Sequence, residues 1–155
     1  MKLAADLALD REVDLRCLPI EDADPGEFES VADIAFPSPP YFCREVYSDE
    51  ETQSCNRYRT ARDWCNGFLV PMMRFQFRAV KPGRNAIVNI ADVKIGSKQF
   101  PLVEWTKRAA CRLGFDFVDS FFYPLRRRFG QMKKGVSKKG VSVELVLVFK
   151  KPGEI

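Results

Sequence analysis

The chain has 155 residues, of which 46% are hydrophobic and 30% are charged, so it is long enough to bury a core of its own. No run of 18 or more apolar residues is present, and Asp6 follows the start too closely for a secretory signal, so we expect a cytoplasmic protein without a membrane span. The net charge of +4 is mild, and the absence of histidine excludes imidazole as a general base or as the partner of a nucleophile.

The first third of the chain predicts short strands separated by turns. Leu3 to Leu9 has the spacing of the end of a helix, and Val13 to Leu18 alternates as a strand does. An acidic turn, Glu21 to Gly26, leads to an apolar strand over Ala32 to Phe36, which Pro37 ends. Residues 42–60 show no period, so we expect a long loop, and loops of this length in compact domains are usually functional.

The rest of the chain alternates between helices and strands. Helical spacing covers Arg62 to Val80, with Trp64, Phe68, Met72 and Met73 as core positions and Lys81-Pro82-Gly83 as its end. A buried strand over Ala86 to Ile90 precedes a helix over Pro101 to Leu113, which Gly114 caps. Two strands follow, at Phe115 to Tyr123 and Val141 to Lys150. The order predicts an α/β sheet, mostly parallel, whose last two strands are antiparallel neighbours at one edge.

Five cysteines are present in an odd number and without a CxxC pair, namely Cys17, Cys43, Cys55, Cys65 and Cys111. Without histidine, a zinc site would require four suitably spaced thiolates, so no metal site is expected. The cysteines are predicted to be free thiols of a reducing compartment rather than a disulfide framework.

A basic loop at 126–140 separates the last two predicted strands. It contains no acidic residue and seven basic ones: Arg126, Arg127, Arg128, Lys133, Lys134, Lys138 and Lys139. Such a run of charges is often only a solvent-exposed loop without a binding role. Because glycines separate the charges and Phe129 and Met132 lie among them, we favour an arm that contacts nucleic-acid phosphates.

The most informative segment is Ser38-Pro39-Pro40-Tyr41, which directly follows the strand over Ala32 to Phe36. Ligands of open α/β sheets bind just beyond the carboxyl ends of the strands. Two consecutive prolines fix two φ angles and remove two N–H donors, so their carbonyls remain as rigid acceptors. The tetrapeptide alone is equally compatible with a structural proline turn, but its place at the end of a strand favours a binding site.

These groups suit the methylation of an amino group that is conjugated to a ring. The lone pair of such an amine is delocalised, so acceptors at Ser38 Oγ and the Pro39 carbonyl can bind its two N–H groups and favour a pyramidal nitrogen. Tyr41 or Phe42 can stack on a base that has been flipped out of a helix. Orientation supplies most of the catalysis, so no histidine is needed.

The sequence resembles the S-adenosylmethionine-dependent amino-methyltransferases, above all the DNA cytosine-N4 and adenine-N6 enzymes, in which Ser-Pro-Pro-Tyr is the catalytic motif. The likeness extends over residues 13–151. It includes the acidic turn at Glu21-Asp22 and the segments Gln53-Ser54, Arg57-Tyr58, Trp64, Lys81-Pro82-Gly83, Val88-Asn89-Ile90-Ala91-Asp92-Val93 and Leu147-Val148-Phe149-Lys150.

The resemblance implies a Rossmann-like methyltransferase sheet of class I and S-adenosylmethionine as cofactor. It implies that Ser38, Pro39, Pro40 and Tyr41 form the amine site, that Asp22 contacts the cofactor adenine, and that Ser38 also borders the cofactor. DNA is the implied substrate. RNA and protein glutamine are alternatives, but the related enzymes that act on them more often carry Asn-Pro-Pro-Tyr. Asn89 and Asp92 lie at the end of a strand, where a role in the active site and a role as capping residues are equally plausible.

One element of that family, a glycine-rich loop of the Phe-x-Gly-x-Gly kind, does not occur in this sequence. In the order that the chain follows, the loop would lie upstream of residue 1. We therefore expect residues 1–155 to form a single, N-terminally truncated methyltransferase domain. It would be a fragment, half of a split enzyme, or a relic that binds nucleic acid or a partner. A complementing subunit or self-association would cover its open sheet edge.

Overall fold

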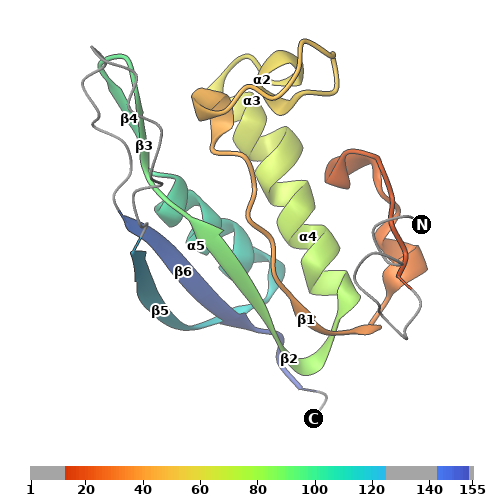
Figure 1. Ribbon diagram of the computed structural model, residues 1–155. Coiled ribbons are helices and arrows are strands. Elements are labelled where there is room, and N and C mark those ends of the chain that lie inside the picture. The colour runs from red at the N-terminus through yellow and green to blue at the C-terminus, as the bar shows by residue number, and fades with distance from the viewer. Residues whose placement is uncertain (1–12, 125–142, 154–155) are drawn as a thin grey trace.

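The computed structural model describes residues 13–124 and 143–153 (Figure 1). The strands are β1 (Ala32–Ala35), β2 (Val80–Ile90), β3 (Val93–Ile95), β4 (Lys98–Phe100), β5 (Asp116–Pro124) and β6 (Val143–Lys150). The helices are α2 (Ser54–Arg57), α3 (Ala61–Trp64), α4 (Val70–Ala79) and α5 (Leu102–Leu113), with a π-helical turn η4 (Cys65–Leu69) and 3₁₀ turns η1 (Ile20–Asp22), η2 (Pro25–Phe28) and η3 (Phe42–Arg44).

The main sheet has the strand order β1-β2-β6-β5. β1 pairs with β2 in parallel, and β6 is antiparallel to both of its neighbours. Three of these four strands therefore point the same way, as the sequence predicts, and β5 and β6 are antiparallel neighbours. The antiparallel strand, however, is not the edge strand: β6 lies inside the sheet, and β5 forms its edge. A second, two-stranded sheet, the β3–β4 hairpin, was not predicted.

The predicted helix over residues 62–80 is confirmed as a continuous run of α3, η4 and α4. Its π-helical turn precedes Pro71, which cannot donate the N–H that would normally pair with the carbonyl of Gly67. The hydroxyl of Tyr58 donates to that carbonyl instead, at 2.8 Å. The proline is therefore accommodated by a local change of helical pitch and by a side-chain donor from outside the helix.

The second predicted helix is also confirmed. α5 ends at Gly114, whose left-handed backbone (φ 105°) lets its N–H bond back to the carbonyls of Ala110 and Cys111. At the other end, Asp92 Oδ1 accepts a hydrogen bond from the N–H of Val103 at 2.9 Å, so Asp92 caps this helix. No helix in the described part of the chain is long and apolar enough to span a membrane.

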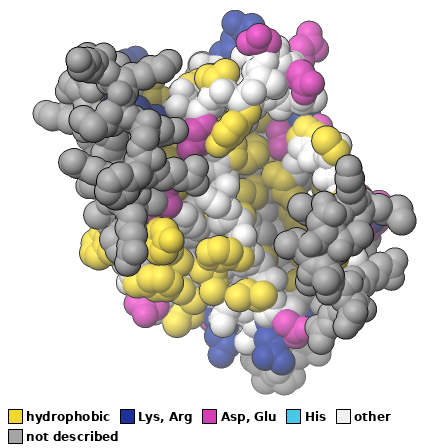
Figure 2. Space-filling model, in the orientation of Figure 1, with side chains coloured by type: hydrophobic (Ala, Val, Ile, Leu, Met, Phe, Trp, Pro, Cys, Tyr) yellow, Lys and Arg dark blue, Asp and Glu magenta, His cyan; other side chains and the backbone are white. Residues whose placement is uncertain are grey.

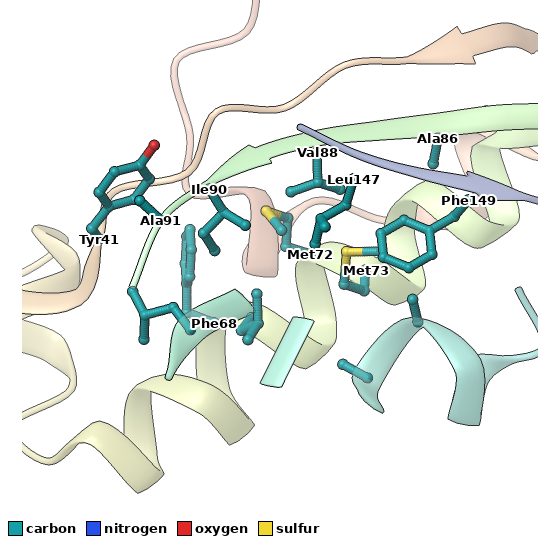
Figure 3. Close-up of a cluster of buried hydrophobic side chains, with 14 of the residues drawn as sticks. Tyr41, Phe68, Met72, Met73, Ala86, Val88, Ile90, Ala91, Leu147 and Phe149 are labelled. Carbon is teal, nitrogen blue, oxygen red and sulfur yellow. The ribbon is translucent and has the colours of Figure 1, made fainter. Parts of the chain in front are cut away.

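The core lies between one face of the sheet and helices α4 and α5. The register places Val88 opposite Leu147 and Ala86 opposite Phe149, and all four side chains are buried. Met72 and Met73 of α4 pack beneath them (Figure 3). Because side chains alternate along a strand, the residues between these positions point to the opposite face. On the side of the molecule seen in Figure 2, hydrophobic side chains gather where Figure 1 shows the main sheet.

Two sequence predictions of local structure were wrong. Residues 13–18 are exposed and form no strand, since no neighbouring strand in the described ranges offers them hydrogen bonds. Lys81-Pro82-Gly83 does not follow the helix as a free end but belongs to β2. There Gly83 has φ 77° and donates its N–H to the carbonyl of Lys151 at 2.9 Å.

Candidate functional site: the turn after strand β1

The Ser-Pro-Pro-Tyr segment forms a turn that the neighbouring strand holds in place. The main-chain N–H of Asn89, in β2, donates to the carbonyl of Pro37 at 3.1 Å. Tyr41 has φ −88° and ψ 70°, and the N–H of Phe42 donates to the carbonyl of Pro40 at 3.0 Å. These values define an inverse γ-turn centred on Tyr41. The turn is therefore fixed at both of its ends by main-chain hydrogen bonds.

The next residue, Phe42, adopts a left-handed backbone with φ 55°. That conformation is unfavourable for a bulky side chain and costs about 1–3 kcal/mol. The ring is buried and lies 6.1 Å from Trp64 and 5.4 Å from Phe100 between centroids. The aromatic core therefore holds the chain in a sharp reversal directly after the tetrapeptide.

The two acceptors that the sequence singled out, at Ser38 and Pro39, differ in their exposure. The carbonyls of Pro37, Pro40 and Tyr41 each accept a main-chain N–H. The Pro39 carbonyl has no such bond among the described residues, but Pro39 is buried, whereas Ser38 is exposed. Ser38 is therefore open to a ligand, while the Pro39 carbonyl is an acceptor without a main-chain donor at a buried residue.

Tyr41 is not placed as the sequence predicted. Its side chain is only 4% exposed, so the ring cannot serve as a platform for a flipped base in this conformation, and Phe42 is equally buried. Figure 3 shows the Tyr41 ring beside Ala91, with the hydroxyl pointing away from the apolar cluster. Burial raises the pKa of Tyr41, and the negative charge of Glu144 raises it further.

A cavity of about 670 Å³ opens beside the turn. Pro40 contributes to its wall, together with the segment 16–21, the loop residues 47–54 and Phe68 of η4. The lining side chains that bear on ligand binding are Glu21, Pro40, Tyr47, Gln53 and Phe68. Small-molecule sites have this size and this mixture of apolar walls with a few polar groups. Ser38 is not among the residues that line the cavity.

Asp22, predicted to contact the cofactor adenine, forms an ion pair with Arg57. Its two carboxylate oxygens accept from the two guanidinium NH₂ groups at 2.7 Å each, and this bidentate pair lowers the pKa of Asp22. The neighbouring Glu21, not Asp22, lines the cavity. The Glu21 side chain is 4% exposed, and its Oε1 lies 3.1 Å from the Tyr58 hydroxyl. The acidic turn is thus in place, but Asp22 is turned toward Arg57.

The loop wall of the cavity is cross-linked by a disulfide between Cys43 and Cys55, whose Cα atoms are 4.9 Å apart. The prediction of five free thiols is therefore wrong for this pair, while Cys17, Cys65 and Cys111 are free. Sequence spacing gave no signal, because the cysteines are twelve residues apart and meet only when the loop folds back. Gln53 also holds the loop, since its amide accepts from the N–H of Tyr47 at 3.3 Å.

A polar pair that the sequence did not single out lies behind the turn. Asn89 Nδ2 donates to a carboxylate oxygen of Glu144, the only acidic residue of β6, at 2.5 Å. The register explains the contact: Asn89 faces Val146, and Glu144 lies two residues before Val146 on the same face of the sheet. A lone acid in an otherwise apolar, alternating strand was the signal that could have identified it.

The basic residues predicted to contact phosphates, Arg126 to Lys139, lie outside the described residues. The strands on either side, β5 and β6, are described, and Glu144 lies close to the start of β6. Within residues 13–124 and 143–153, no cluster of carboxylates and thiols is placed to hold a metal ion.

No protein-family model and no curated protein matches this sequence. Solved structures do match. The candidate DNA modification methylase TTHA0409 from Thermus thermophilus superposes with a TM-score of 0.62 at 21% identity, over 88% of this chain and 52% of that one. Its complex with S-adenosyl-L-methionine gives 0.61 at 20% identity, over 89% and 55%. The [4+2]-cyclase SpnF gives 0.60 at 14% identity, over 99% and 62%.

These likenesses define the class of fold: a mixed α/β sheet shared with TTHA0409 and SpnF. The chain spans about half the length of TTHA0409. One of the two similar proteins is described as a DNA methylase and the other as a cyclase, so the fold alone does not decide the reaction. The reaction depends on the residues of the site.

Proposed function

We propose that this chain is the catalytic part of an S-adenosylmethionine-dependent methyltransferase that acts on an exocyclic amine of a nucleic-acid base. The observation that carries the proposal is the Ser-Pro-Pro-Tyr turn. It lies at the carboxyl end of β1, exposes Ser38, leaves the Pro39 carbonyl without a main-chain donor, and borders a cavity of about 670 Å³ through Pro40. The likeness to TTHA0409, a structure solved with the cofactor, supports it.

The cavity residues fit S-adenosylmethionine. Glu21 supplies a carboxylate for hydroxyl or amino donors, Tyr47 is 74% exposed and offers an aromatic face, and Pro40 and Phe68 are apolar. We assign the adenosine part to this cavity and retain Asp22 as a second acceptor, because each of its oxygens has a lone pair beyond the bond to Arg57. When bound, the cofactor supplies an electrophilic methyl group.

The residues of the turn bind and orient the target amine. Its two N–H groups donate to Ser38 Oγ and to the Pro39 carbonyl, which favours a pyramidal nitrogen with a localised lone pair. The turn is fixed by the hydrogen bond from Asn89 and by the hydrogen bond within the γ-turn, so little free energy is needed to order the acceptors. Orientation of the amine then supplies the rate enhancement. Phe36, 64% exposed and two residues before Ser38, is the aromatic side chain that we assign to stacking on the base.

DNA is the substrate that we propose, with cytosine N4 or adenine N6 as the methylated atom, and RNA as the alternative. The basic segment with Arg126, Arg127, Arg128, Lys133, Lys134, Lys138 and Lys139 would contact the phosphates. This assignment predicts binding that weakens steeply with salt. The amine chemistry is the same for both nucleic acids, so a comparison of DNA and RNA oligonucleotides distinguishes them.

The cofactor assignment is tested by calorimetric titration of the full chain with S-adenosylhomocysteine. We expect micromolar binding that weakens in Asp22→Ala. Arg57→Met, which breaks the ion pairs of Arg57 with both Asp22 and Glu21, controls for the loss of ion pairing, and Asp24→Ala controls for the loss of a nearby acid that makes no contact with Arg57. Absence of binding by the folded chain would contradict the assignment.

A second candidate function, a binding module without catalysis, is favoured by one observation. Val31, Ile34 and Phe36, in and beside β1, are each more than half exposed, and β1 has a partner strand on one side only among the described residues. Such an edge favours self-association or a complementing subunit. A chain that dimerises or binds DNA, but does not bind S-adenosylhomocysteine, would support this second function.

A further inference from the structure

Behind the Ser-Pro-Pro-Tyr turn lies a polar group that the proposed reaction does not yet use. It consists of the Tyr41 hydroxyl, the side chain of Asn89 and the carboxylate of Glu144. The Tyr41 hydroxyl and Asn89 Oδ1 are both buried and have no hydrogen-bond partner among the described residues. Buried polar groups without partners are rare in folded proteins and need an explanation.

The members of this group come from three different elements. Tyr41 ends the turn after β1, Asn89 lies near the end of β2, and Glu144 lies at the start of β6. β6 runs antiparallel to β2, so β6 begins at the end of the sheet where β1 and β2 finish. The sheet topology therefore brings a carboxylate to the end of the sheet that carries the amine site.

Two links connect Glu144 to the tetrapeptide. First, Glu144 accepts from Asn89 Nδ2 at 2.5 Å, and the main-chain N–H of Asn89 holds the Pro37 carbonyl at 3.1 Å. Second, the Tyr41 hydroxyl is buried without a partner, and the charge of Glu144 raises the pKa of Tyr41 while Ser38 lowers it. Glu144 thus holds the residue before Ser38 through the first link and bears on Tyr41, the last residue of the tetrapeptide, through the second.

We propose that Glu144 is a positioning residue of the amine site. This inference rests on the proposed function. In it, the Tyr41 hydroxyl donates a hydrogen bond to the Glu144 carboxylate and accepts a hydrogen bond from the Ser38 hydroxyl. That order of donors directs the lone pairs of Ser38 Oγ outward, toward the N–H of the target amine. Without the carboxylate, the Tyr41 hydroxyl can instead donate to Ser38 Oγ and compete with the substrate.

The experiment compares Glu144→Gln with Glu104→Gln, which removes a carboxylate from the exposed face of α5. Glu144→Gln is expected to lower kcat about a hundredfold, as loss of orientation does, with little change in the KM for S-adenosylmethionine. Glu104→Gln is expected to change neither. If Glu144 acts through the tyrosine, the losses in Tyr41→Phe and in the double variant with Glu144→Gln will not add. Additive losses would overturn the inference.

A readout without catalysis separates this inference from the proposed function. In nuclear magnetic resonance spectra of the full chain, the Asn89 side-chain amide is expected to shift between wild type and Glu144→Gln, because the bond to the carboxylate is lost. Glu104→Gln should leave this signal unchanged. A chain that shows this difference but does not methylate any nucleic acid would contradict the proposed function alone. An Asn89 amide signal that is identical in wild type and Glu144→Gln would overturn the role of Glu144.

Discussion

The Tyr58 hydroxyl donates to the carbonyl of Gly67 at 2.8 Å, the carbonyl that Pro71 leaves without its helical partner. The ring lies so close to Gly67 that a Cβ atom there would stand 2.8 Å from Tyr58 Cζ and 2.9 Å from Cδ1. Because Tyr58 also contacts Glu21, this contact connects the π-helical turn to the acidic turn beside the cavity. A side chain larger than that of glycine would therefore collide with the Tyr58 ring at this point of the helix.

Substitution of this glycine tests that relationship. Gly67→Ala is expected to displace the Tyr58 ring and to lower the free energy of unfolding by about 1–3 kcal/mol, the usual cost of overpacking. Urea unfolding measures the loss. Gly153→Ala, at a position with no atom within 4 Å of the added methyl, is the matched control. Equal stability of the two variants would show that Tyr58 does not pack as described.

The Asp22–Arg57 pair predicts a pH-dependent contribution to stability. Arg57 lowers the pKa of Asp22 below its ordinary value of 3.8, so the pair stabilises the folded chain above about pH 4 and loses its effect as pH falls through the lowered pKa. Asp22→Asn should therefore be less stable than wild type at pH 7 in urea unfolding, and the difference should shrink toward about pH 2. A difference independent of pH would contradict the pairing.

The disulfide between Cys43 and Cys55 predicts that the loop beside the cavity is sensitive to reductant. Loss of a cross-link over a loop of this length costs about 3 kcal/mol. We expect reductant to lower the urea midpoint of wild type but not that of the double variant Cys43→Ser, Cys55→Ser. Alkylation followed by mass spectrometry should modify three of the five cysteines without reductant. Modification of all five would contradict the bond.

Gln76 offers a prediction about buried polarity. Its side chain lies in α4 at 4% exposure, and neither amide atom has a hydrogen-bond partner among the described residues. Gln76→Met, which keeps the length of the side chain, is expected to raise the free energy of unfolding by about 1–3 kcal/mol. Gln53→Met, which breaks the bonds of Gln53 to Tyr47 and Glu45, should lower it. Changes of the same sign in both variants would contradict this account.

Periodicity predicted those parts of the fold in which local sequence and tertiary packing agree. The helices that contain Met72 and Ala110 and the strand that contains Val88 follow from alternating or helical spacing, and all three side chains are buried. The alternating residues at Val13 to Leu18 met no neighbouring strand, so the same signal failed there. Local pattern shows that a segment can form a strand, whereas pairing decides whether it does.

The candidate site was predictable only in part, for the same reason. Ser38 is exposed just beyond β1, as its place after a strand predicts, whereas Pro39 is buried. Tyr41 is buried in a core cluster that brings distant segments together, and the contact between Asn89 and Glu144 depends on a register across 55 residues. Spacing along the chain carries no information about such contacts.

The central claim, methyl transfer to a base amine at the Ser-Pro-Pro-Tyr turn, is tested most directly by incubating DNA with the full chain and isotope-labelled S-adenosylmethionine, followed by nucleoside mass spectrometry. The account predicts labelled N4-methylcytosine or N6-methyladenine. It also predicts a loss of about 10²–10³ in turnover for Ser38→Ala, the usual effect of removing one organised polar group, with unchanged binding of S-adenosylhomocysteine. Ser97→Ala, on the exposed β3–β4 turn, should behave as wild type. Full turnover by Ser38→Ala, or no labelled base although the cofactor binds, would contradict the claim.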